Sequence, residues 1–563
     1  MKRSLLFLLL IAVALIPVTT FSQQLNDKRA DEAVRQKAYK LLESLAEQIG
    51  SLQSGENRAR MGSNIAMSLW PHNEAKAREM FATVTKEIKA GLQPDDKDYN
   101  RYLARPNFIK LREDTALRIG MFDPEWALRF LEETKPVDVR ISDVVQSELN
   151  LQLAVLFVRK NPDLALKLGR ETLQHGVSPF QLGLIYELTK KSRPHASALL
   201  AEIVKIAPNQ NIRHAMDREQ IYFKLARLVE PYLGHDPAFR DLMNYFTELA
   251  LQSGCDNKKL PDTDTMAFCY RLGLVVPLME KVDPRRVAPL KHLARTGGFP
   301  YEWEPPLTEY DDVYQNGSVE DLIALIPRYP HFRNFGQGLV IRELIEAGDF
   351  ERARKFANEF NWAPASKQEV LKELDDAQRI VNEDTSAKIL KEAEGLRDES
   401  ETFHQLFRVA TQIGTKNPQT TVKLLDRASE LLEKIPPQRW KMQYQIGITV
   451  RYCQVKSDRC FTMAEPIIRK MNELVSAATK LDGFDNSYLR NGEWNMTAEG
   501  GVGSLLTGLA QNAAYFALYD FDRAVTLSSL FERREIRMMA QLKLAQGVLE
   551  ERPKKSLFPD DEH

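Results

Sequence analysis

The sequence predicts an all-α protein built from stacked antiparallel helical hairpins, an arrangement called an α-solenoid. A helix–turn–helix pattern occurs at residues 151–173 and returns along most of the chain. The copies lie a few tens of residues apart, which is the period typical of solenoid repeats. No stretch alternates apolar and polar residues between hairpin turns, so we expect no sheet.

The copy at residues 151–173 shows how one hairpin is encoded. Apolar residues at helical spacing, including Leu151 and Val155, predict the first helix. Asn161 has the side-chain oxygen needed to cap a second helix, and Pro162 suits its first position because proline lacks an N–H. Ala165 follows four residues after the cap. Because its side chain is small, the second helix can approach the first closely.

A capping residue followed four positions later by a small residue recurs through the chain. Strict copies occur at Asp123 with Ala127, Asp349 with Ala353, Asp520 with Ala524, and Asn73 with Ala77. Looser copies begin at Ser192, Asp236, Asp283 and Asn417. Caps by themselves would fit any large helical protein. The small residue in the same place favours a solenoid, in which each repeat contacts only its neighbours.

Two stretches resemble the tetratricopeptide repeat more closely. Residues 344–360, LIEAGDFERARKFANEF, resemble the turn and second helix of such a repeat, with Gly348 and Asp349 at the turn and Ala353 as the packing residue. Residues 517–531, ALYDFDRAVTLSSLF, are similar. The first-helix Trp-Leu-Gly-Tyr pattern is missing, and the period varies. The resemblance implies a helical-repeat protein that serves as a binding scaffold, by analogy of fold.

The first 22 residues predict a secretory signal peptide. Lys2 and Arg3 precede an apolar run too short to span a membrane, and Thr20 and Ser22 suit cleavage before Gln23. No later apolar run approaches ~20 residues. We therefore expect an exported protein, periplasmic or extracellular, that is soluble and has no transmembrane anchor after cleavage near Ser22.

The charge balance argues against nucleic acid as a partner. Without Lys2 and Arg3, 75 basic residues face 78 acidic residues. No basic block provides the positive patch that phosphate backbones attract. The apolar content of 43% indicates a folded chain.

The four cysteines form two local pairs, Cys255 with Cys269 and Cys453 with Cys460. In an oxidising compartment we predict a disulfide in each pair. Free buried thiols are the alternative. A zinc site is disfavoured because no Cys-x-x-Cys motif or nearby histidine accompanies the cysteines.

The composition divides the chain into five parts. We expect a signal peptide at 1–22, an N-terminal helical-repeat region at 23–296 and a linker loop rich in proline and aromatics at 297–317. A C-terminal helical-repeat region follows at 318–553, interrupted by an irregular loop at 483–501. Residues 554–563 form a polar tail, which we expect to be frayed.

The linker loop combines aromatic rings with carboxylates. Its candidate ligand residues are Tyr301, Glu302, Trp303, Glu304, Tyr310, Asp311 and Asp312. Flat rings stack on the apolar face of a sugar while carboxylates accept its hydroxyls, and paired carboxylates are what glycoside hydrolysis requires. The alternative is a structural strap between the two helical regions.

The second loop supplies further candidates. Asp482 and Asp485 carry oxygen ligands, but their spacing does not fit an EF-hand. We expect Trp494 to anchor the loop by packing. The glycines before Ser504 lack the Lys-Ser or Lys-Thr of a phosphate loop, so we expect turns there and Ser504 as a helix cap.

No catalytic constellation stands out in the sequence. The nine histidines occur singly, and neither His-Glu-x-x-His nor Gly-x-Ser-x-Gly is present. We expect a non-enzyme with no cofactor and no metal site. The sequence therefore favours a secreted or periplasmic scaffold that binds a protein or peptide partner on a concave surface of stacked hairpins.

A cell-envelope protein that binds or cleaves a polysaccharide is the alternative. Periplasmic lytic transglycosylases are similar in placing a glycan-cleaving domain on a helical solenoid. Their signature joins a catalytic Glu-Ser to a downstream Gly-Leu-Met-Gln. Glu399 and Ser400 match the first motif, but the second is missing. A glycan stays an alternative ligand by analogy.

Overall fold

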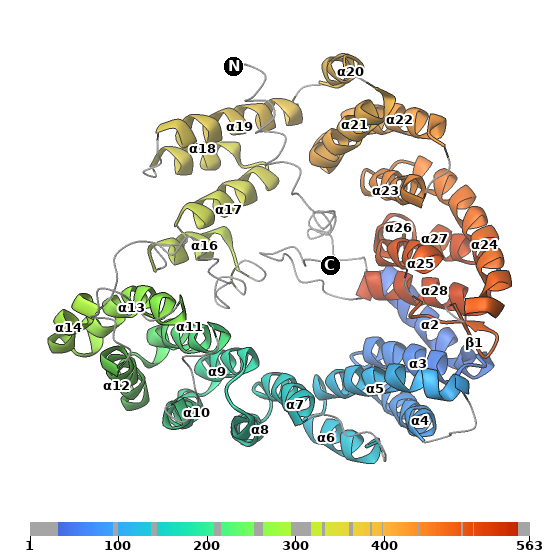
Figure 1. The fold of residues 1–563 in the computed structure, drawn as a ribbon. Helices are drawn as coiled ribbons and strands as arrows, with labels where there is room; N and C mark the ends of the chain where they lie inside the picture. Colours follow the sequence, from blue (N-terminus) through green and yellow to red (C-terminus); the bar gives the residue numbers. More distant parts are fainter. Residues whose placement is uncertain are drawn as a thin grey trace. The chain divides into compact units, whose positions relative to one another are not determined.

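The structure is a computed structural model that describes most of the chain (Figure 1). The described residues are 32–93, 99–136, 143–207, 216–252, 263–293, 313, 317–328, 333–359, 364–382, 385–396, 398–436, 439–485, 488–498 and 500–549. They are helical apart from turns and one short hairpin, which confirms the all-α prediction. The predicted signal peptide and tail lie outside them. No helix among these residues is long and apolar enough to cross a membrane.

The chain forms two compact units. One contains residues 1–87 and 313–563, and the other contains residues 88–312. The boundary at 312 falls inside the stretch predicted as a linker. The boundary at 87 falls inside helix α4 (Glu74–Leu92), where no change in composition marks it.

The unit of residues 88–312 is a two-layer stack of helices. Its helices are α5 (Tyr99–Gly120), α6 (Pro124–Glu133), α7 (Asp143–Phe157), α8 (Pro162–Thr172), α9 (Pro179–Lys191), α10 (Arg193–Ile206), α11 (Met216–Leu233), α12 (Pro237–Gln252), α13 (Thr263–Val282) and α14 (Val287–Leu293). The odd-numbered helices α5 to α13 contact one another in sequence, and so do α8, α10, α12 and α14. Each layer therefore takes every second helix, as stacked hairpins require.

The other unit joins helices from both ends of the chain. Its N-terminal helices are α2 (Glu32–Gln48), α3 (Gly55–Leu69) and most of α4. Its later helices are α16 (Val319–Leu325), α17 (Arg333–Glu346), α18 (Phe350–Glu359), α19 (Pro364–Asn382), α20 (Ser386–Glu394), α21 (Glu399–Ile413), α22 (Pro418–Lys434), α23 (Arg439–Gln454), α24 (Arg459–Asp485), α25 (Gly501–Gln511), α26 (Ala513–Tyr519), α27 (Phe521–Ser528) and α28 (Arg534–Leu549). Both α2 and α3 pack against α28.

The predicted caps begin their helices. The side-chain oxygen of Asn161 accepts the Leu164 N–H at 3.0 Å, and that of Asp349 accepts the Arg352 N–H at 3.1 Å. Equivalent bonds occur at Asn73, Asp123, Asp236, Asp283, Asn417 and Asp520. The Ser504 prediction is wrong, because α25 begins after Gly500, whose φ of +79° suits a glycine.

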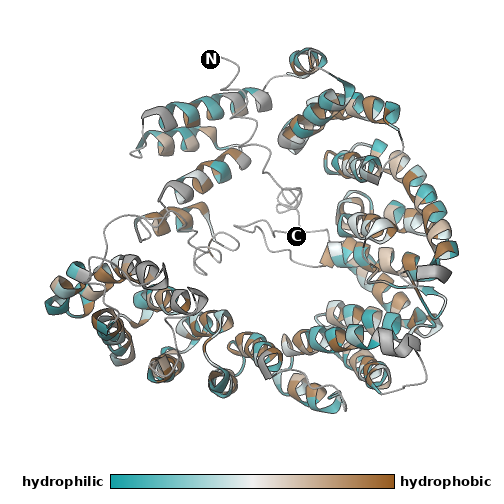
Figure 2. Cartoon of the chain, in the orientation of Figure 1, coloured by the Kyte–Doolittle hydropathy of each residue, from teal (hydrophilic) through white to brown (hydrophobic). Residues whose placement is uncertain are grey.

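The small residues after the caps are buried between helices. Ala127, Ala165 and Ala353 are fully buried, and Ala524 is 2% exposed. Gly348 has a φ of +74° at the turn before α18, and Phe356 is buried one turn after Ala353. Figure 2 shows hydrophobic and hydrophilic residues on different sides of many helices. These positions therefore carry the helix–helix contacts, while membership of the tetratricopeptide family stays a prediction.

The predicted disulfide between Cys453 and Cys460 is present and closes the turn between α23 and α24. The two Cα atoms lie 4.9 Å apart. Cys269 is buried in α13, but Cys255 lies outside the described residues, so that pair stays a prediction.

A two-stranded hairpin lies in the loop predicted to be irregular, and the prediction of no strand is wrong there. Strand β1 (Leu489–Arg490) pairs antiparallel with β2 (Glu493–Trp494). Asn491 and Gly492 form the turn with φ values of +52° and +76°. Asn-Gly suits this two-residue turn because both central residues need a positive φ.

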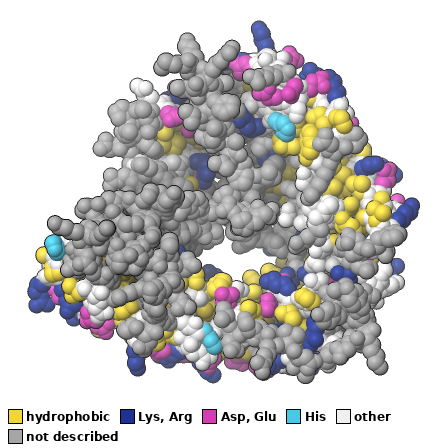
Figure 3. Space-filling model, viewed as in Figure 1, with side chains coloured by type: hydrophobic (Ala, Val, Ile, Leu, Met, Phe, Trp, Pro, Cys, Tyr) yellow, Lys and Arg dark blue, Asp and Glu magenta, His cyan; other side chains and the backbone are white. Residues whose placement is uncertain are grey.

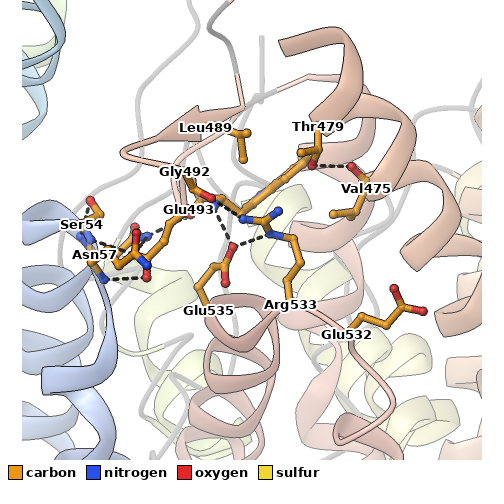
Figure 4. Close-up of polar contacts among 12 residues, drawn as sticks. Ser54, Asn57, Val475, Thr479, Leu489, Gly492, Glu493, Glu532, Arg533 and Glu535 are labelled. Atoms are coloured by element: carbon orange, nitrogen blue, oxygen red, sulfur yellow. Dashed lines mark hydrogen bonds and ion pairs between the residues drawn. The ribbon is translucent and has the colours of Figure 1, made fainter. Parts of the chain in front are cut away.

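The hairpin places Glu493 at the N-terminus of α3. Its carboxylate accepts the backbone N–H groups of Gln53 at 2.6 Å and Ser54 at 2.9 Å, and the Asn57 side chain donates at 3.3 Å (Figure 4). Glu493 is 8% exposed. A buried carboxylate needs such donors, and the positive end of the helix dipole also favours it.

The neighbouring residue joins the same hairpin to α28. The Trp494 N–H donates to Glu535 at 2.7 Å, and its carbonyl accepts the Asn57 side chain at 3.0 Å. Arg533 bonds both Glu535 and the Gly492 carbonyl, as Figure 4 shows. The hairpin therefore links α3 to α28, although 439 residues separate Ser54 from Glu493.

We predict that Glu493→Ala lowers the free energy of unfolding by about 2–4 kcal/mol, because two backbone N–H groups lose their acceptor. Chemical denaturation measures this change. The control is Glu532→Ala, an exposed neighbour, which should change stability by less than about 0.5 kcal/mol. Equal effects of the two substitutions would show that the junction contributes little.

We predict that Ala165→Leu and Ala353→Leu each cost about 1–3 kcal/mol, because the added atoms overpack a closed helix–helix contact. Ala524→Leu should cost less. Ala524 lines an apolar cavity of about 40 Å³ among α24 to α28, which leaves room for part of a larger side chain. Denaturation midpoints of the three variants test this order, and an unchanged midpoint for Ala165→Leu would contradict the assigned hairpin register.

Candidate binding surface

The first set of predicted ligand residues cannot be placed. Tyr301, Glu302, Trp303, Glu304, Tyr310, Asp311 and Asp312 all lie outside the described residues. Their role in binding a ligand stays a prediction.

Two residues of the second predicted set have structural contacts. The Asp482 carboxylate accepts the N–H groups of Tyr488 at 2.6 Å and Leu489 at 3.0 Å, so both oxygens hold the start of the hairpin. Trp494 is 2% exposed and stacks on Tyr488 with the ring centres 5.0 Å apart. The side chain of Asp485 lies outside the described residues. Among the described residues, no three His, Cys, Asp or Glu side chains are grouped to hold a metal ion.

Glu399, the residue shared with the transglycosylase signature, lies in the first turn of α21. Its carboxylate bonds the Lys434 ammonium at 2.6 Å, and 57% of its side chain is exposed. The residue therefore takes part in a surface ion pair between α21 and α22.

A serine, a histidine and an aspartate meet where α8 and α10 begin. Ser192 Oγ lies 2.6 Å from His195 Nδ1, and His195 Nε2 lies 2.9 Å from Asp163 Oδ1. These residue types match the hydrolytic triad, in which a buried aspartate orients the imidazole. Here the Asp163 side chain is 89% exposed. The arrangement serves best as a link between neighbouring helices of one layer.

The strongest candidate for binding is a group of aromatic side chains on α21 and α23. We define the aromatic surface as His404, Phe407, Trp440 and Tyr444, with Phe403 buried beneath it. His404 is exposed, and the other three side chains are partly exposed. Figure 3 shows hydrophobic side chains gathered over this part of the unit.

Helical spacing brings these rings together. His404 and Phe407 are three residues apart on α21, and Trp440 and Tyr444 are four apart on α23, so each pair shares one face. Tyr444 meets Phe407 edge-on with the ring centres 5.3 Å apart and Trp440 edge-on at 5.8 Å. The contacts between rings of α21 and α23 place these two helices side by side.

The ring contacts fix the surface in one arrangement. His404 lies 5.1 Å from Tyr444 and 5.9 Å from Trp440, measured between ring centres. Gly447 makes room for this packing, because a Cβ atom there would lie 3.1 Å from the Phe407 ring. A larger residue would push the Phe407 ring away from α23.

Burial among the rings shifts the pKa values of two titratable groups. It lowers the pKa of His404 below its ordinary value, and the Asp398 carboxylate opposes this shift. Burial also raises the pKa of the Tyr444 phenol. At neutral pH both groups are therefore uncharged.

The aromatic surface was not predicted from the sequence. The histidines were noted there only as single residues, and neither Trp440 nor Tyr444 was a candidate ligand residue. The available signal was the aromatic pairs three and four residues apart in two helices of consecutive hairpins. Only the register in which those hairpins stack, which the residue spacing does not specify, brings the two pairs together as one surface.

Comparisons with known proteins assign no family. No protein-family model matches this sequence, and no curated protein matches it. A solved structure described as a circular tandem repeat protein with novel repeat topology and enhanced subunit contact surfaces is similar at 14% identity, over 91% of this chain and 97% of that chain, with a TM-score of 0.13. This TM-score is too low to support an argument about fold or function.

We predict that protonation of His404 destabilises the folded protein. Its pKa is lower in the folded state than in the unfolded chain, so the unfolded state takes up the proton first as the pH falls. The stability gained from the neutral His404 imidazole is complete above the pKa of the unfolded chain, about 6.5. It is lost as the pH falls below that value towards the folded-state pKa. Titration of the His404 ring protons by NMR should give a pKa below about 6.5.

The substitution that tests the cause of this shift is Tyr444→Ala, which uncovers one side of the imidazole. It should raise the pKa of His404 towards the ordinary value. An unchanged pKa in this variant would show that ring burial does not cause the shift.

Proposed function

We propose that this protein is a non-catalytic scaffold that binds a protein or peptide partner, with the aromatic surface as part of the contact. The observation that carries the proposal is the group formed by exposed His404 and partly exposed Phe407, Trp440 and Tyr444 on adjacent helices. Tryptophan and tyrosine are enriched at the energetic centres of protein interfaces, because they bury a large area at a small cost in conformational entropy.

The rigidity of the surface supports this proposal. The rings contact one another, and Phe403 beneath them is fully buried. A partner therefore meets side chains that are already ordered, so that little further ordering entropy is lost on binding. The stacked hairpins supply the frame, since repeat folds are commonly used to bind other proteins.

We also propose that the protein works in an oxidising compartment outside the cytoplasm. The disulfide between Cys453 and Cys460 supports this placement, because disulfides persist mainly in such compartments.

The test is site-specific photo-crosslinking in cells that express the full chain. A benzophenone amino acid replaces Gln443, which is exposed on α23 beside Tyr444. We expect a protein adduct in the wild-type background that disappears with Trp440→Ala and Tyr444→Ala together. Purified partner should then bind the double variant at least about thirtyfold more weakly, the effect of losing an interface hot spot.

The matched control is Phe180→Ala, which removes another exposed aromatic side chain, on α9. This variant should retain the adduct. An adduct equally present in all variants would contradict the proposal. If no protein adduct forms and the protein binds a polysaccharide through Trp440 and Tyr444, the ligand of the aromatic surface is a glycan.

A further inference from the structure

The tip of the hairpin between β1 and β2 exposes two residues that can react with each other. Asn491 and Gly492 are both exposed, and their φ values are +52° and +76°. Among the residues that the structure describes, none bonds the Asn491 side chain and none accepts the Gly492 N–H. The Gly492 carbonyl, by contrast, accepts Arg533 at 2.6 Å (Figure 4). Hydrogen bonds to these residues therefore restrain neither the Asn491 amide nor the nitrogen that follows it.

A backbone nitrogen that follows an asparagine can attack the carbonyl carbon of that side chain and close a succinimide ring. Glycine favours this step because no side chain shields its nitrogen. Apart from the chain neighbours, no described atom lies within 4 Å of where a Cβ of Gly492 would stand. Asn472 provides a contrast, because its Nδ2 donates to the Leu530 carbonyl at 2.8 Å and its Oδ1 accepts the Glu532 N–H at 3.3 Å. These contacts favour reaction at Asn491 over Asn472.

We propose that Asn491 is a site of spontaneous deamidation, and that its isoaspartate product releases the start of α3 from the hairpin. The Gly492 nitrogen loses its proton to water and bonds to Cγ of Asn491. The bond from Cγ to Nδ2 breaks, and this nitrogen takes up a proton and leaves as ammonia. Water then opens the succinimide at either of its carbonyls, which gives aspartate or isoaspartate. The reaction needs no oxidant and no reactant other than water.

The two products affect the hairpin differently. Aspartate leaves the backbone unchanged, and Asp-Gly suits the same two-residue turn. Isoaspartate carries the main chain through its side chain and so inserts a methylene group into the turn. Because turn length sets the register that pairs Arg490 with Glu493, the longer turn displaces Glu493. The N–H groups of Gln53 and Ser54 then lose the carboxylate that accepts them.

Ageing of the purified full chain in neutral buffer at physiological temperature tests the modification. Peptide mass spectrometry detects the conversion of the amide to an acid, and an isoaspartate-specific methyltransferase distinguishes isoaspartate from aspartate. We expect both acids to accumulate at Asn491, with isoaspartate as the main product, while Asn472 stays an amide. The sequence holds a second Asn-Gly pair, Asn316 and Gly317, which mass spectrometry follows on a separate peptide.

Hydrogen exchange at the Gln53 and Ser54 amides tests the release. In a fraction of molecules equal to the isoaspartate content, both amides should exchange at least about thirtyfold faster than in fresh protein, because they have lost a charged acceptor. The matched control is Asn491→Gly. Gly-Gly suits the same turn and cannot form the succinimide, so this variant should keep slow exchange after the same ageing. Fresh Asn491→Asp, which adds the charge without the methylene group, should match fresh wild-type protein.

Acid that forms no faster at Asn491 than at Asn472 would overturn the proposal. Isoaspartate at Asn491 with unchanged exchange at Gln53 and Ser54 would also overturn it, because the turn would then tolerate the added methylene group. Fast exchange in aged Asn491→Gly would assign the loss of protection to a different lesion and contradict the proposal as well.

Discussion

Two buried carboxylates, Glu493 and Glu535, hold one hairpin between α3 and α28 in the larger unit. Glu493 accepts hydrogen bonds from Gln53, Ser54 and Asn57 at the start of α3. The adjacent Trp494 bonds Glu535 at the start of α28. Burying a charge costs free energy unless donors compensate it, so these bonds must form together for the hairpin to sit between the two helices. The junction adds to the direct contacts of α2 and α3 with α28.

The helical hairpins and the aromatic surface both depend on how the helices pair and stack. A cap and a small residue let two helices pair closely, and stacked pairs bring every second helix into one layer. In that layer the rings of α21 meet those of α23, although Phe407 and Trp440 lie 33 positions apart in the chain. The surface is thus a product of stacking, and its rigidity comes from the packing of Phe403 and Tyr444.

The parts of this structure that local chemistry determines were predictable from sequence. Asn161, Asp349 and Asp520 cap helices because their side chains bond N–H groups three residues away. The junction of Glu493 with Ser54 was not predictable, since the two residues lie far apart in the chain. A glutamate at position 493 would also suit an exposed loop. Asn491–Gly492 is a local signal for a two-residue hairpin turn, although the loop was predicted to be irregular.

Hydrogen exchange at individual amides tests the junction most directly. The N–H groups of Gln53 and Ser54 donate to Glu493, so their exchange reports whether that carboxylate stays in place. The account predicts that both amides exchange as slowly as those in the middle of α28, because α3, the hairpin and α28 open as one cooperative unit. Fast exchange at Gln53 and Ser54 beside a protected α28 would contradict it, and the two ends would then fold independently.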